Sequence, residues 1–166
     1  MTSLLQTVAY ESWALHALIW LPLVGMFVVL LGPRERAKHV AFAWSAGLFV
    51  LSLGLWWAFD PTGDLFQLSN RSEWIEAWGV SYALGVDGIS LFMILLTGLT
   101  MPLAILGSFR YIEDRERAFY ALMLLLQTGL VGVFASMDLF LFYVFFELTL
   151  VPMYFIIGVW VGERRI

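Results

Sequence analysis

Long apolar stretches, separated by short polar segments, dominate the sequence. A helix rises 1.5 Å per residue, so crossing a hydrocarbon core of about 30 Å takes roughly 20 apolar residues. Five stretches have about that length: residues 14–32, 40–59, 89–109, 118–136 and 139–161. The pattern predicts an all-α polytopic membrane protein, in which residues 1–166 form a single transmembrane domain with five membrane-spanning helices.

Composition narrows the class of protein further. Hydrophobic residues make up 61% of the 166-residue chain and charged residues 13%, whereas about a quarter of a soluble domain is charged. This balance excludes intrinsic disorder and a basic nucleic-acid binder. The chain has no cysteine, and its two histidines, His16 and His39, are far apart. No disulfide, iron–sulfur or metal site is therefore expected, and membrane lipids are the expected surroundings.

Positive charges are distributed unevenly between the predicted connections. Eight of the nine lysines and arginines lie between the first and second stretches, between the third and fourth, or after the fifth: Arg34, Arg36, Lys38, Arg110, Arg115, Arg117, Arg164 and Arg165. Arg71 lies in a connection of the opposite parity. The positive-inside rule places the side rich in lysine and arginine in the cytoplasm or its equivalent. We therefore expect the N-terminus outside and the C-terminus inside.

The long connection of residues 60–86 is expected on the outer side as an interfacial segment. Asn70, followed three residues later by Glu73, resembles the capping box of a short helix. The side chains that such a helix presents on one side are Trp74, Ile75 and Trp78. Tryptophan suits the headgroup layer, where its ring and its N–H are both satisfied, so anchoring is preferred here to contact with a partner subunit.

Two aspartates stand immediately before predicted helices. Asp87 precedes the third stretch and Asp138 precedes the fifth. A carboxylate there accepts hydrogen bonds from free N–H groups and complements the positive end of the helix dipole. Capping is therefore favoured over a proton-loading role for both residues.

Glu147 is the acidic residue that lies inside a predicted span. It is nine residues beyond Asp138, roughly 14 Å into the bilayer at helical rise and so near the midplane. A charged carboxylate there costs at least about 2.5–3.5 kcal/mol. It must be protonated, paired with a cation or wetted by a cavity, which are the states between which a proton relay cycles. The alternative is a permanently protonated glutamic acid that hydrogen-bonds a neighbouring helix; intramembrane acids more often mark ion pathways.

Three other residues support this hypothesis. Pro152, five residues after Glu147, removes a backbone hydrogen bond from the Leu148 carbonyl, which either opens a water path or leaves an inert kink. Gln127 and Thr128 form a polar pair midway along the fourth stretch. They either line a water path or hydrogen-bond across helices, and the second is more usual. The five stretches contain no lysine, arginine or mid-span histidine to neutralise Glu147.

Several motifs resemble a known family. One runs from Phe145 through Glu147 and Pro152-Met153-Tyr154 to Gly162-Glu163-Arg164-Arg165. Two others cover residues 84–92 and 119–129. Together they resemble the antiporter-like subunit M of respiratory complex I, NADH-quinone oxidoreductase, the homologue of mitochondrial subunit four. The Pro-Met-Tyr after the glutamate favours subunit M over the sister subunits L and N.

This resemblance implies a function. The carboxylate that matches Glu147 is a proton-channel residue in that family, paired with a lysine on a later helix. The family fold has about fourteen helices in two inverted repeats of five, so the resemblance implies that this chain is an N-terminal fragment. It also implies a translocase subunit in a bacterial inner (plasma) membrane rather than a mitochondrial one, beside the L and N subunits. NADH, FMN, the iron–sulfur clusters and quinone would then be bound by other subunits, with no cofactor in this chain.

Two other functions stay open at the level of sequence. One is a subunit of a multisubunit sodium/proton antiporter without a redox partner. The other is a structural membrane scaffold in which Glu147 makes a hydrogen bond between helices.

Overall fold

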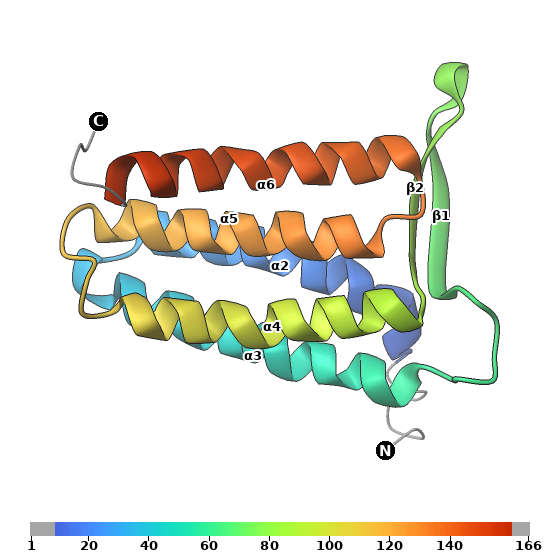
Figure 1. Ribbon diagram of the computed structural model, residues 1–166, viewed down its shortest axis with the longest axis horizontal. Helices are drawn as coiled ribbons and strands as arrows, with labels where there is room; N and C mark the ends of the chain where they lie inside the picture. Colours follow the sequence, from blue (N-terminus) through green and yellow to red (C-terminus); the bar gives the residue numbers. More distant parts are fainter. Residues whose placement is uncertain (1–8, 161–166) are drawn as a thin grey trace.

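The computed structural model of the chain describes residues 9–160. Five long helices run alongside one another (Figure 1): α2 (Tyr10–Leu31), α3 (Ala37–Ala58), α4 (Gly88–Ser108), α5 (Glu116–Ala135) and α6 (Leu139–Trp160). A short 3-10 helix, η1 (Arg34–Arg36), leads into α3. Within this range each of the five long helices is long and apolar enough to cross a membrane. The prediction of five candidate spans is confirmed.

The chain is nevertheless not all-α, because a β-hairpin lies between α3 and α4. Strands β1 (Gln67–Ile75) and β2 (Val80–Val86) pair antiparallel, and the 3-10 helix η2 (Glu76–Trp78) joins them. Gly79 ends the turn in the left-handed region at φ 67°, which glycine adopts without a steric penalty. Figure 1 shows the hairpin standing across one end of the helices.

The prediction of a short helix after Asn70 is therefore wrong. Asn70 pairs with Leu84 and Glu73 with Ser81 as neighbours on opposite strands. The physical reason lies in β2, whose residues are buried except for the half-buried Tyr82. A strand so buried needs a partner for its backbone N–H and C=O groups, and β1 supplies it while keeping most of its own side chains exposed.

Both predicted caps are confirmed, and one of them also holds the hairpin. The Asp87 carboxylate accepts a hydrogen bond from the Ser90 N–H at 2.7 Å at the start of α4. Asp138 Oδ1 accepts from the N–H groups of Phe140 and Leu141 at 2.9 and 3.2 Å at the start of α6. Asp138 Oδ2 accepts two further bonds, from the N–H and hydroxyl of Ser81, at 3.1 Å each. The same carboxylate thus joins α6 to β2.

Helix α5 is the centre of the bundle and α6 is at its edge. In an apolar stretch of 18 residues within each helix, 61% of the stretch is buried in α5 but only 22% in α6. Helix α5 packs against α2, α3, α4 and α6, whereas α6 packs chiefly against α5 and β2. One face of α6 therefore lies open in the described chain.

Two glycines allow α5 and α6 to approach closely. A Cβ on Gly129 would lie 2.7 Å from Cγ2 of Thr149, and a Cβ on Gly132 would overlap the ring of Phe145. Small residues at helix contacts bring backbones together where lipid offers no hydrophobic drive for association. The α5–α6 contact thus depends on the absence of side chains at these positions.

Candidate functional site

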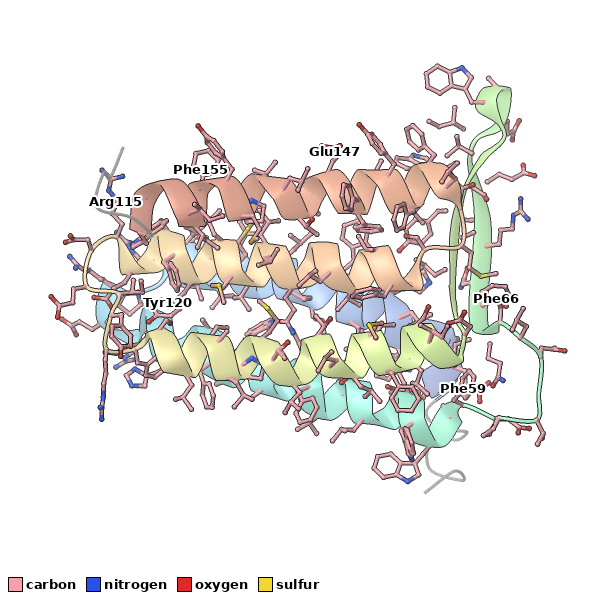
Figure 2. The ribbon with its side chains drawn as sticks, viewed as in Figure 1. Phe59, Phe66, Arg115, Tyr120, Glu147 and Phe155 are labelled. Atoms are coloured by element: carbon pink, nitrogen blue, oxygen red, sulfur yellow. The ribbon has the colours of Figure 1, made fainter. Side chains whose placement is uncertain are left out.

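Glu147 lies on the open face of α6. Its side chain is exposed, and Figure 2 shows it on the side of the helix that faces away from α5. Tyr143 is one turn earlier on the same face, 57% exposed, and its hydroxyl is near enough to the Glu147 carboxyl to interact with it. The other large exposed side chains of this face are apolar or aromatic: Phe146, Leu150, Val151 and Tyr154.

The sequence suggests that the Glu147 carboxylate is buried. The described helices leave it exposed instead. Within residues 9–160, Arg34 forms an ion pair with Glu116. No lysine, arginine or histidine of this range forms an ion pair with Glu147. A carboxylate in hydrocarbon needs a proton, a cation or water. Whatever covers this face must supply one of them.

Gln127 lies inside the bundle, whereas Glu147 is exposed on its surface. It is buried in α5, and its Oε1 accepts a hydrogen bond of 2.9 Å from the Ser45 hydroxyl of α3. This is the interhelical bond that the sequence pattern favoured as the simpler interpretation. Ser45 itself was missed, because a serine in an apolar span carries no signal of its partner.

Thr128 is fully buried in α5, and its hydroxyl has no hydrogen-bond partner among the groups of the described chain. It lines a cavity of about 400 Å³ together with Trp20 of α2, Tyr82 of β2 and Phe145 and Leu148 of α6. The walls are mostly apolar side chains. The hydroxyl is thus a polar atom placed beside an apolar cavity.

Pro152 is buried, and α6 continues through it from Leu139 to Trp160. One turn away, Thr149 donates from its hydroxyl to the Phe146 carbonyl at 2.7 Å. Pro152, Gln127 and Thr128 are all buried while Glu147 is exposed, so the structure does not bring the four predicted site residues into one cluster. Tyr143 is the neighbour that the prediction missed, although its spacing of four from Glu147 was a readable signal.

The hairpin end carries its own polar contacts. Trp20 Nε1 donates to the Tyr82 hydroxyl at 3.1 Å, and His16 Nδ1 lies 3.2 Å from the same oxygen. Burial raises the pKa of Tyr82, while the Ser81 N–H is the largest influence that lowers the pKa of Asp138. Across the part of the chain that the structure describes, no group of three His, Asp or Glu side chains is placed to hold a metal ion.

Solved structures define the class of this fold. Respiratory complex I from Thermus thermophilus contains a chain that matches with a TM-score of 0.70 and 30% identity, over 83% of this chain and 27% of that one. The Mrp complex from Dietzia matches with a TM-score of 0.73, over 90% of this chain and 16% of that one. At 20% identity, the second match shows the fold alone. The helices are arranged as in chains of these two complexes.

Sequence relatives define the family. Residues 16–133 match the family described as NADH-ubiquinone oxidoreductase chain 4, amino terminus. A chain 4 of NAD(P)H-quinone oxidoreductase from a Picosynechococcus species is 37% identical over 91% of this chain and 28% of its own length. Subunit M of NADH-quinone oxidoreductase from Rickettsia prowazekii is 35% identical over 89% of this chain and 31% of its own. The chain belongs to the chain 4/subunit M family, and it spans about a third of the length of these relatives.

Proposed function

We propose that the chain is part of a proton-translocating membrane-arm subunit of NADH-quinone oxidoreductase, with Glu147 as a proton relay. The observation that carries the proposal is the position of Glu147 on α6. A carboxyl group stands near the middle of an apolar, membrane-length helix, on the face that the other four helices leave open. Intramembrane acids are costly and characteristically mark ion pathways.

The chemistry needs a cationic partner outside the described residues. A nearby ammonium stabilises the carboxylate, so the acid releases its proton when the partner approaches. When the partner withdraws, the neutral acid is the stable form in a low-dielectric site, and a proton is taken up again. The open face of α6 is where a later helix that carries a lysine would pack. Tyr143 would hold the carboxylate in one orientation through its hydroxyl.

Gln127, Thr128 and Pro152 take supporting roles in this proposal. The Thr128 hydroxyl offers a free hydrogen-bonding group beside a cavity that reaches Leu148, one residue from Glu147. Gln127 fixes α5 against α3 through Ser45. Pro152 cannot donate to the Leu148 carbonyl, which leaves an acceptor beside the acid.

The remaining assignments follow from family membership. The redox cofactors NADH, FMN, iron–sulfur clusters and quinone would be bound by other subunits of the complex, and L- and N-type subunits would be the neighbours. The complete subunit would have about fourteen helices. In the five described helices, the N-terminal end would lie outside and the C-terminal end inside the plasma membrane of a bacterium. The unequal distribution of arginine and lysine between the two ends supports that orientation.

A multisubunit sodium/proton antiporter is the second candidate function. The observation in its favour is the shared fold with the Mrp complex. The family relatives are named as oxidoreductase subunits, which supports the first candidate.

The test is Glu147→Gln in the assembled complex. Glutamine keeps the shape and hydrogen bonding of glutamic acid but does not exchange a proton, so proton translocation should be lost and NADH:quinone turnover should fall with it. Glu113→Gln, on the connection between α4 and α5, is the matched control and should pump normally. Normal pumping by a fully assembled Glu147→Gln complex would reduce Glu147 to a structural hydrogen bond. Sodium-dependent proton exchange with no NADH:quinone turnover in the unchanged protein would favour the antiporter.

A further inference from the structure

The end of the bundle remote from the hairpin contains a cationic pocket. Its volume is about 420 Å³, and it lies between the end of α2 and the start of α5. This volume is in the range of sites that hold small molecules. The residues that line the pocket are Leu30, Arg34, Arg115, Glu116, Arg117 and Ala118.

The three arginines are not equally neutralised. Arg34 forms an ion pair with Glu116, 3.5 Å between Nε and Oε1, and also donates to the Glu113 carbonyl. Arg117 makes one long hydrogen bond of 3.5 Å, to the Leu30 carbonyl. The Arg115 side chain makes no ion pair or hydrogen bond within residues 9–160. With three arginines and one glutamate, the lining carries a net charge of +2.

The backbone at Arg115 is strained. Its φ of 50° and ψ of 37° place a non-glycine residue in the left-handed region, which is unfavourable for a side chain with a Cβ. This conformation begins α5 without a side-chain cap, so the first N–H groups of the helix face the same end as the arginines. Figure 2 shows Arg115 at that end, close to where α6 finishes.

We propose that this pocket binds the phosphate group of an anionic phospholipid. Guanidinium groups form charge-assisted hydrogen bonds with phosphate oxygens, and basic pockets between membrane helices hold acidic headgroups. The source is a lipid rather than a soluble phosphate because the pocket ends on apolar helix surface. Leu30 and Ala118 line it, and the adjacent Leu31 is 85% exposed, which offers a path for an acyl chain along α2.

Native mass spectrometry of the purified complete chain tests the proposal, because it resolves single bound lipids. Titration with phosphatidylglycerol should give a Kd that rises by about fivefold for each arginine removed, in Arg115→Gln, Arg117→Gln and the double variant. Phosphatidylcholine binding should not change. Arg71→Gln, on β1 at the opposite end, is the matched control and should bind phosphatidylglycerol normally.

Arg115→Gly separates binding from folding. Glycine relieves the left-handed backbone, so the melting temperature should hold or rise while phosphatidylglycerol binding weakens. A purely structural arginine would give lower stability instead. Unchanged phosphatidylglycerol affinity in the double variant would overturn the proposal, as would an equal loss in Arg71→Gln. Displacement of the lipid by millimolar inorganic phosphate would identify a site for free phosphate and overturn the lipid assignment.

Discussion

Ser45 and Gln127 are joined by a buried hydrogen bond of 2.9 Å between α3 and α5. The next residue along α5, Thr128, is equally buried, and its hydroxyl has no partner within residues 9–160. Two adjacent polar residues in the same helix thus have opposite hydrogen-bonding status. A satisfied bond stabilises the packing of helices, whereas an unsatisfied buried hydroxyl costs free energy.

The first prediction compares these two positions. Gln127→Leu should lower the free energy of unfolding by about 1 kcal/mol, because Ser45 loses its acceptor. Thr128→Val should leave the stability unchanged or raise it, because it removes a hydroxyl that has no partner. Thermal unfolding of the purified variants measures both. A large loss of stability in Thr128→Val would show that the hydroxyl has a structural partner in the intact protein.

The second prediction concerns the α5–α6 contact. Gly132→Ala should destabilise the chain by about 1–3 kcal/mol, because the new methyl group meets the ring of Phe145 and forces the helices apart. Gly107→Ala in α4 is the control, since nothing lies within 4 Å of a Cβ there. That substitution should be neutral or slightly stabilising, because alanine favours the helix more than glycine does. Equal stability of the two variants would contradict the close approach.

The third prediction concerns acid sensitivity at Asp138. Hydrogen bonds from Ser81 and from the start of α6 keep its pKa below the ordinary value of 3.8. The folded chain therefore favours the ionised carboxylate, and the stabilisation is complete above about pH 4 and disappears as the pH falls through the lower, folded-state pKa. Asp138→Asn should melt at a lower temperature than the unchanged chain at pH 7, and the difference should shrink as the pH falls below about 4.

Asp64→Asn is the control for this pH series, because Asp64 is exposed in the connection before β1. Its melting curve should follow that of the unchanged chain across the pH range. A difference between Asp138→Asn and the unchanged chain that does not change with pH would show that the carboxylate charge is not what holds β2 to α6.

The fourth prediction concerns orientation in the membrane. The chain has no cysteine, so single cysteines introduced at Glu35 and Asn70 can be labelled without background. Both positions are exposed and lie at opposite ends of the bundle. A membrane-impermeant reagent applied to intact cells should label Asn70→Cys and leave Glu35→Cys unlabelled until the cells are opened. Labelling of both from outside would reject the proposed topology.

The helices were predictable because each requires only a property that the sequence shows directly, a run of apolar residues of sufficient length. The largest change in a boundary is at α2, which begins at Tyr10 rather than at residue 14. Polar Glu11 and Ser12 continue the helix there. Helix propensity and the burial of Tyr10 extend α2 beyond its apolar stretch, whereas a prediction from hydropathy places the start of the helix where the apolar stretch starts.

The hairpin was not predictable in the same way. The spacing of Asn70 and Glu73 suits a helix cap, and nothing local to β1 contradicts that interpretation. The strand exists because β2 is buried against the ends of α2, α4, α5 and α6 and needs a backbone partner. This requirement comes from parts of the chain that are distant in sequence, so the residues of the short polar segment that forms β1 hardly indicate it.

For the candidate site, the sequence identified Glu147 as an unusual residue but not the face of the bundle on which its side chain lies. Glu147 is recognisable as a charge inside an apolar stretch. That it is exposed, away from Gln127 and Thr128, depends on which face of α6 meets α5, and that face is chosen by Gly129 and Gly132 on the other helix. The partner helix therefore holds information that the stretch containing Glu147 lacks.

The bond between Asp138 and Ser81 also has a consequence for rotation. Asp138 immediately precedes α6 (Leu139–Trp160), and Glu147 lies nine residues further along the chain. With Asp138 tied to the hairpin, α6 is not free to spin, and the azimuth of the Glu147 carboxyl is set from a point about 14 Å along the helix. A movement of the hairpin would therefore reach the start of α6, the helix that carries Glu147.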